Sequence, residues 1–98
     1  MNLIYHQDLK NNLHSEYRDV FNQIKPNSKI LELGCHTGYF ASFLINQGCD
    51  VTGIESNAEA AKIAELCGAT VILGNIEDPN ILQGINEKFD HILAMNVL

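Results

Sequence analysis

The feature that most constrains the fold is a short apolar run that leads directly into a glycine-rich loop. Residues 29–33 (KILEL) are mostly apolar, and the following loop, residues 34–38 (GCHTG), begins and ends with glycine. Residues 37–47 then place apolar side chains at helical spacing, which predicts a helix. A buried strand that turns through glycine into a helix is typical of α/β folds that bind ligands at this turn.

The same order of strand and helix continues along the chain. Strands are predicted at residues 50–55, 70–73 and 89–95, and helices begin after a cap at Ser56 or Asn57 and at Pro79. Alternation at this spacing predicts a Rossmann-like, doubly wound α/β fold with a parallel sheet and helices on both faces. A further helix is predicted before the first strand, where apolar residues recur every three or four positions at Leu9, Leu13, Tyr17, Val20, Phe21 and Ile24.

Length and composition exclude several classes of function. The 98 residues suffice for one domain, and a formal net charge of -6 argues against a general binder of the nucleic-acid backbone. No apolar run approaches the roughly 20 residues that a membrane span needs. Three cysteines without a C-x-x-C pair predict no metal site. Their odd number and the lack of a signal peptide predict a cytoplasmic protein.

Two separate elements predict a ligand that contains adenosine. The glycines of the loop allow a ligand to approach the backbone closely. Glu55 ends the second predicted strand about 20 residues later, the offset at which a carboxylate accepts hydrogen bonds from ribose hydroxyls. His36 stands where the dinucleotide fingerprint G-x-G-x-x-G has its second glycine, so a nicotinamide-dependent oxidoreductase is the weaker alternative.

Four segments in order resemble motifs of the class I S-adenosylmethionine-dependent methyltransferases. Residues 30–40 resemble the first motif, residues 51–55 the acidic strand after it, residues 74–78 the segment that frames the adenine, and residues 89–98 the fourth-strand motif. The resemblance covers residues 28–98, the N-terminal half of such a domain, after a helical segment at residues 1–27. It implies S-adenosyl-L-methionine as cofactor, a methyl acceptor that the sequence does not identify, and strand order 3-2-1-4 for the four strands.

The resemblance also implies roles for individual residues. The first motif would surround the methionine portion, Glu55 would hold the ribose hydroxyls, and Asn75 and Ile76 would contact adenine, with Asn75 reaching the amino group. Asn96 would border the sulfonium or the substrate. No catalytic residue is assigned. The predicted cofactor-binding residues are Glu32, Gly34, Cys35, His36, Gly38, Glu55, Ser56, Asn75, Ile76 and Asn96.

The chain departs from the family's pattern in the loop, in the adenine segment and at its end. His36 replaces a small residue, Asn75 replaces the more frequent aspartate, and the chain ends at Leu98. Since the family's domain continues for about three more strands, we expect a truncated sheet whose fourth strand is an open edge able to self-associate. A module that only binds cofactor and an inactive pseudo-enzyme therefore remain alternatives to an active transferase.

Overall fold

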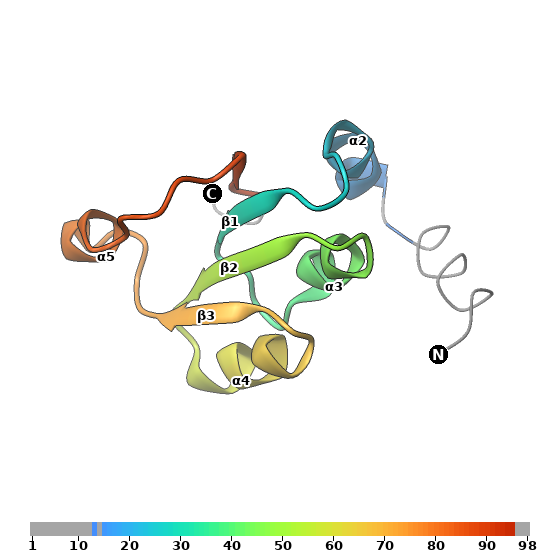
Figure 1. Ribbon diagram of the computed structural model, residues 1–98. Coiled ribbons are helices and arrows are strands. Elements are labelled where there is room, and N and C mark those ends of the chain that lie inside the picture. The colour runs from blue at the N-terminus through green and yellow to red at the C-terminus, as the bar shows by residue number, and fades with distance from the viewer. Residues whose placement is uncertain (1–12, 14, 96–98) are drawn as a thin grey trace.

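A four-stranded parallel sheet forms the centre of the molecule in the computed structural model, which describes Leu13 and residues 15–95 (Figure 1). The strands lie in the order β3-β2-β1-β4, and every neighbouring pair is parallel. The predicted α/β fold and the order 3-2-1-4 are therefore confirmed. The bounds of the strands are β1 Lys29–Leu33, β2 Asp50–Glu55, β3 Thr70–Leu73 and β4 His91–Leu93.

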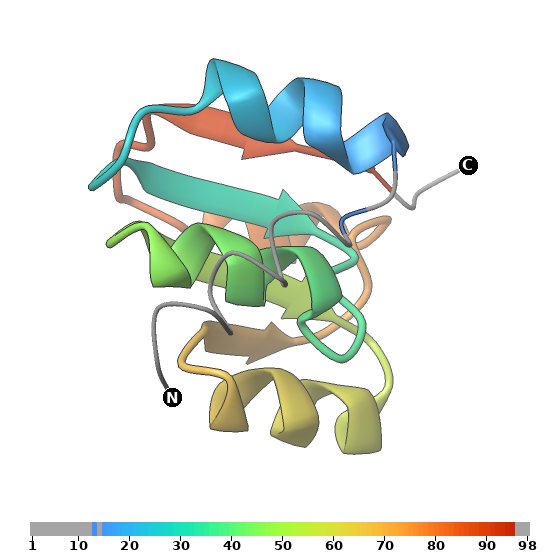
Figure 2. The same cartoon turned by 90° about the vertical axis from the view of Figure 1, so that its right-hand side faces the viewer.

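Helices cover both faces of the sheet, as the alternation predicts. Figure 2 shows the short α5 (Pro79–Gln83) behind the sheet. In front of the sheet lie α2 (Ser15–Gln23), α3 (Tyr39–Asn46) and α4 (Ala58–Leu66). The sheet is thus doubly wound, with most of its helical cover on one face.

The main core lies between the sheet and helices α2 and α3. Ile30 of β1 and Val51 of β2 are buried in this core, where they pack with Phe40 and Leu44 of α3. The predicted apolar stripe before β1 is confirmed for the described residues, while Leu9 lies outside them. The buried members of this stripe are Leu13, Tyr17, Phe21 and Ile24.

Two predictions about elements need correction. The predicted helix at residues 37–47 is too long, since α3 spans only Tyr39–Asn46. Tyr39 at its start is 37% exposed and lies with its ring against Tyr17 and Phe43. The predicted strand at residues 89–95 is also too long, since β4 spans only His91–Leu93.

The start of β4 is set by a side chain. The backbone N–H of Asp90 donates to the carbonyl of Lys29, and the Asp90 carboxylate accepts from the N–H of Lys29, both at 2.7 Å. This carboxylate takes the place of a ladder partner, and such side-chain bonds compete with regular pairing. Within the described part of the chain β4 is an edge strand that pairs with β1 alone, and Ile92 on it is 64% exposed. Self-association through this edge stays a prediction.

Candidate functional site

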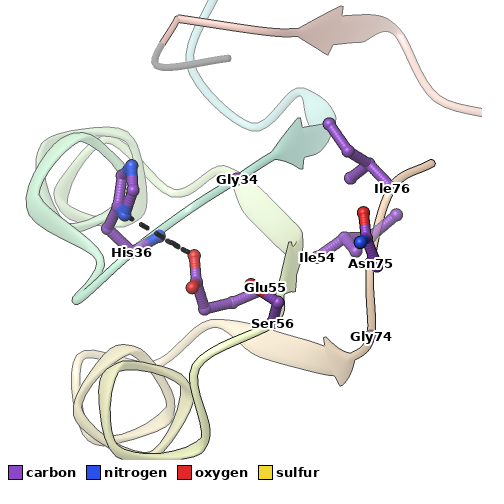
Figure 3. A pocket seen from close by; sticks show the side chains of 8 residues that line it. All are labelled: Gly34, His36, Ile54, Glu55, Ser56, Gly74, Asn75 and Ile76. Carbon is purple, nitrogen blue, oxygen red and sulfur yellow. Dashed lines mark hydrogen bonds and ion pairs between the residues drawn. The ribbon is translucent and has the colours of Figure 1, made fainter. Parts of the chain in front are cut away.

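A pocket of about 130 Å³ lies where three strands end (Figure 3). Parallel strands bring the segments that follow them to one edge of the sheet, and this edge is where open α/β sheets bind ligands. The pocket receives residues from the ends of β1, β2 and β3. Its lining consists of Gly34, His36, Ile54, Glu55, Ser56, Gly74, Asn75 and Ile76.

The loop after β1 forms one wall of this pocket. Gly34, His36 and Gly38 all adopt left-handed backbone conformations, with φ of 72°, 52° and 84°. The backbone N–H groups of Gly34 and Cys35 donate to the carbonyl of Ile54, at 2.8 and 3.2 Å. The loop is therefore fastened across to β2, and these two N–H groups are not free to bind a ligand.

Glu55 connects the loop after β1 with the loop after β2. Its Oε1 accepts the backbone N–H of His36 at 2.8 Å, and its Oε2 accepts the backbone N–H of Asn57 at 3.0 Å. The residue is only 6% exposed. A carboxylate has about four acceptor positions, so each oxygen keeps one for a donor in the pocket. Glu55 is thus a fixed carboxylate at the pocket wall, and its role in binding ribose stays a prediction.

The imidazole of His36 does not fill the bend. Its Nδ1 lies 3.7 Å from Oε1 of Glu55, and the side chain is 57% exposed. In Figure 3 it stands at the opposite end of the pocket from Asn75 and Ile76. Gly34 and Glu55 both remain part of the lining.

The other end of the pocket is apolar with one polar side chain. Ile54 is fully buried and Ile76 is half-buried, and Figure 3 shows both beside Asn75. Oδ1 of Asn75 accepts the backbone N–H of Glu77 at 2.9 Å. Ile54 and Gly74 were not predicted as site residues. Their positions at strand ends, next to Glu55 and Asn75, were the signal that could have identified them.

Three predicted residues lie in the site region without lining the pocket: Glu32, Cys35 and Gly38. Gly38 packs against α4, where a Cβ would come within 3.1 Å of the Cα of Ala64. Asn96 lies outside the described residues. Cofactor contact by these four residues stays a prediction.

Glu32 is a buried carboxyl with an unsatisfied oxygen. It is 1% exposed, and its Oε1 has no hydrogen-bond partner among the described residues. Burial away from water raises the pKa of Glu32 from 4.5 to about 8. A buried polar atom without a partner costs about 1–3 kcal/mol, so a donor that reached this oxygen would be stabilised.

Cys35 points into the sheet and away from the pocket. It is 2% exposed, and a Cβ on Gly53 would overlap its Sγ. Burial, with a smaller effect from the carboxylates of Glu32 and Glu55, raises the pKa of the Cys35 thiol to about 11. A thiol with such a pKa is a poor nucleophile at neutral pH. Cys35 therefore has a packing role in this structure.

The described residues, 13 and 15–95, hold no group of three or more His, Cys, Asp or Glu side chains placed to bind a metal ion. No helix within them has both the length and the apolar character that crossing a membrane requires.

Comparison with known proteins identifies the family. A family model described as a methyltransferase domain matches residues 5–98. The chain belongs to this methyltransferase family. The family is not that of the nicotinamide-dependent oxidoreductases, which were the weaker alternative. No curated protein matches the sequence.

Solved methyltransferase structures share the fold of this methyltransferase domain. A TehB-like SAM-dependent methyltransferase from Corynebacterium glutamicum matches with a TM-score of 0.70 and 25% identity, over 92% of this chain and 52% of that one. TehB from Haemophilus influenzae gives 0.68 and 25% over 84% of this chain and 29% of that one. The plantazolicin methyltransferase BamL, in complex with a triazolic desmethylPZN analog and SAH, gives 0.57 and 32%. The chain covers 32% of BamL, and BamL aligns with 89% of the chain. The chain thus spans about half the length of the first of these proteins and a third or less of the others.

Proposed function

We propose that the protein binds S-adenosyl-L-methionine in the pocket at the ends of β1, β2 and β3 and transfers its methyl group to an acceptor. The observation that carries this proposal is the position of Glu55. Its carboxylate is fixed by the N–H groups of His36 and Asn57, lines the pocket, and keeps an acceptor position on each oxygen. Two such positions suit the two neighbouring hydroxyls of a ribose.

The rest of the pocket suits the remaining parts of the same ligand. The half-buried side chain of Ile76 offers an apolar contact for a purine ring, with the buried Ile54 behind it, and Gly34 lets a ligand approach the backbone. The unsatisfied Oε1 of Glu32 is a ready partner for the amino group of the methionine portion, directly or through a water molecule. The complex of BamL with SAH supports the choice of ligand.

The chemistry needs little from the protein beyond position. When bound, the cofactor supplies a methyl group activated by the positive sulfonium. The chain holds the adenosyl portion through Glu55 and excludes water with Ile54 and Ile76, which supports the reaction by orientation. The Cys35 thiol does not serve as a nucleophile, because it is buried and its pKa is about 11.

Isothermal titration calorimetry with S-adenosylmethionine and S-adenosylhomocysteine tests the proposal. We expect both ligands to bind, and we expect Gly34→Val to abolish binding, because Gly34 lines the pocket and its φ of 72° is unfavourable for a β-branched residue. Ser42→Ala, at a half-buried position of α3 that does not line the pocket, serves as the control and should bind both ligands normally. The absence of heat with either ligand on the unaltered protein would contradict the proposal.

A further inference from the structure

Asn75 is held in one orientation by its own backbone. Its Oδ1 accepts the N–H of Glu77, two residues later, at 2.9 Å. The turn continues with a bond from the N–H of Asp78 to the carbonyl of Asn75 at 3.0 Å. This Asx-turn is a common local structure for asparagine and aspartate. It occupies the acceptor end of the Asn75 side chain.

The end of the amide that remains for a ligand is therefore a donor. An amide side chain carries one acceptor oxygen and one NH₂ group with two donors. No hydrogen bond from Nδ2 of Asn75 to the described residues is present, and Asn75 lines the pocket. Rotation of the amide by 180° would set its NH₂ group against the N–H of Glu77. That loses a hydrogen bond and places two donors together.

An aspartate at this position would behave differently. It could form the same turn with one carboxylate oxygen and present the other oxygen, an acceptor, to the pocket. The change from carboxylate to amide therefore reverses the hydrogen-bond polarity of this group while it preserves the backbone. Both side chains have nearly the same shape.

We propose that Asn75 recognises the purine of the ligand as a hydrogen-bond donor, through Nδ2, and so does not select for the 6-amino group of adenine. The 6-amino group is itself a donor, so Nδ2 has to bond to an acceptor on the base: a ring nitrogen, or a 6-oxo group where the base has one. The inference rests on the proposed function, since it concerns the base of the same ligand. It replaces the expectation that Asn75 holds the amino group.

The test compares two ligands with three forms of the protein, the unaltered chain and two variants. The ligands are S-adenosylhomocysteine and its deaminated analogue S-inosylhomocysteine, which carries a 6-oxo group in place of the 6-amino group. One variant is Asn75→Asp, which keeps the turn. The other is Asn75→Ala, a control that lacks both the carbonyl oxygen and the NH₂ group of the side chain. Dissociation constants come from calorimetry, and the two ligands carry the same charge, so their ratio removes any general effect of the new carboxylate.

We expect Asn75→Asp to shift the ratio of affinities toward the adenosyl ligand by at least tenfold relative to the unaltered protein. Asn75→Ala should lie between the two. If both ligands bind and the ratio is the same in all three proteins, the inference is overturned while the proposed function stands. If neither ligand binds the unaltered protein, the proposed function fails and the inference fails with it.

A spectroscopic measurement supports the same distinction. The side-chain NH₂ resonances of Asn75 are identified in an ¹H–¹⁵N spectrum as those missing from Asn75→Asp. They should shift when S-inosylhomocysteine is added. Unchanged side-chain resonances, together with shifted backbone resonances of Gly34 and His36, would contradict a bond from Nδ2 to the base.

Discussion

The ends of β1 and β2 each carry a buried glutamate, and the two differ in whether their carboxyl oxygens have hydrogen-bond partners. Glu55 of β2 uses both oxygens to hold backbone N–H groups of two different loops. Glu32 of β1 has an oxygen without any partner, and burial raises its pKa to about 8. The first carboxyl organises the site before any ligand arrives. The second carries an unfavourable energy that only a bound group or a water molecule can relieve.

The largest expected effect is a change in the free energy of unfolding with pH, caused by ionisation of Glu32. Burial raises the pKa of Glu32 from 4.5 to about 8, so the folded protein favours the neutral carboxyl. The contribution of Glu32 to stability is therefore fully present below pH 4.5 and is lost as the pH rises toward 8. At about 1.4 kcal/mol per pH unit, the loss across this window is on the order of 5 kcal/mol. Urea unfolding of the unaltered protein and of Glu32→Gln between pH 5 and 8 measures it.

The variant is the control for this prediction, because glutamine has the same shape and does not titrate. We expect the free energy of unfolding to fall with pH in the unaltered protein relative to Glu32→Gln. Parallel pH profiles would show that Glu32 ionises in the folded state as easily as it does in water.

A smaller loss of stability is expected from Glu55→Ala. The substitution leaves the N–H groups of His36 and Asn57 without their acceptor, and hydrogen bonds to charged groups contribute about 1.5–3 kcal/mol each. Because His36 is exposed, water can replace part of the lost hydrogen bonding, and we expect the free energy of unfolding to fall by about 3 kcal/mol, measured by thermal or urea unfolding. Glu59→Ala, on the exposed start of α4, is the control. A loss below about 0.5 kcal/mol, the size typical of a surface change, would mean that the two loops are not held together by Glu55.

The rates at which Cys35 and Cys67 are alkylated test how the two glutamates and burial affect the Cys35 thiol. Cys35 is buried near both glutamates and its pKa is about 11, whereas Cys67 is exposed. We expect iodoacetamide at pH 8 to modify Cys67 well before Cys35, with mass spectrometry of digested peptides as the readout. Glu32→Gln should speed the labelling of Cys35 slightly, because it removes one of the carboxylates that raise its pKa. Equal rates for Cys35 and Cys67 in the folded protein would contradict the burial of the Cys35 thiol.

The smallest effect is expected at His36. Its φ of 52° is unfavourable for a residue with a side chain and costs about 1 kcal/mol. Replacement by glycine removes this strain but also the imidazole beside Glu55 and adds entropy to the unfolded chain. We expect His36→Gly to stabilise the protein by about 0.5 kcal/mol or less. A clear destabilisation would show that the contact between the imidazole and Glu55 outweighs the strain.

The regular part of the fold was predictable because its signals are local. Apolar runs bounded by Gly, Pro and Asn located β1, β2 and β3 at their observed bounds, and alternation with helices predicted the parallel sheet. β4 was not predictable to the same degree. Its start depends on hydrogen bonds between Asp90 and Lys29, which are 61 residues apart in sequence.

The candidate site was predictable by position and not by orientation. Six of the predicted residues line the pocket: Gly34, His36, Glu55, Ser56, Asn75 and Ile76. The inward direction of Cys35 and the missing partner of Glu32 follow from how the strands pair and what packs on them, which no motif encodes. The orientation of the Asn75 amide depends on a turn with Glu77, which requires the backbone to be known.

A Cβ at Gly53 would overlap both the Sγ and the Cβ of Cys35, so the side chains at these two positions compete for one volume. A side chain at residue 53 needs the volume that Cys35 occupies in the loop after β1, so it requires glycine at residue 35. Homologous sequences that have gained a side chain at the first position should therefore have lost one at the second. A single replacement of Gly53 is therefore expected to destabilise the protein unless residue 35 has already lost its side chain.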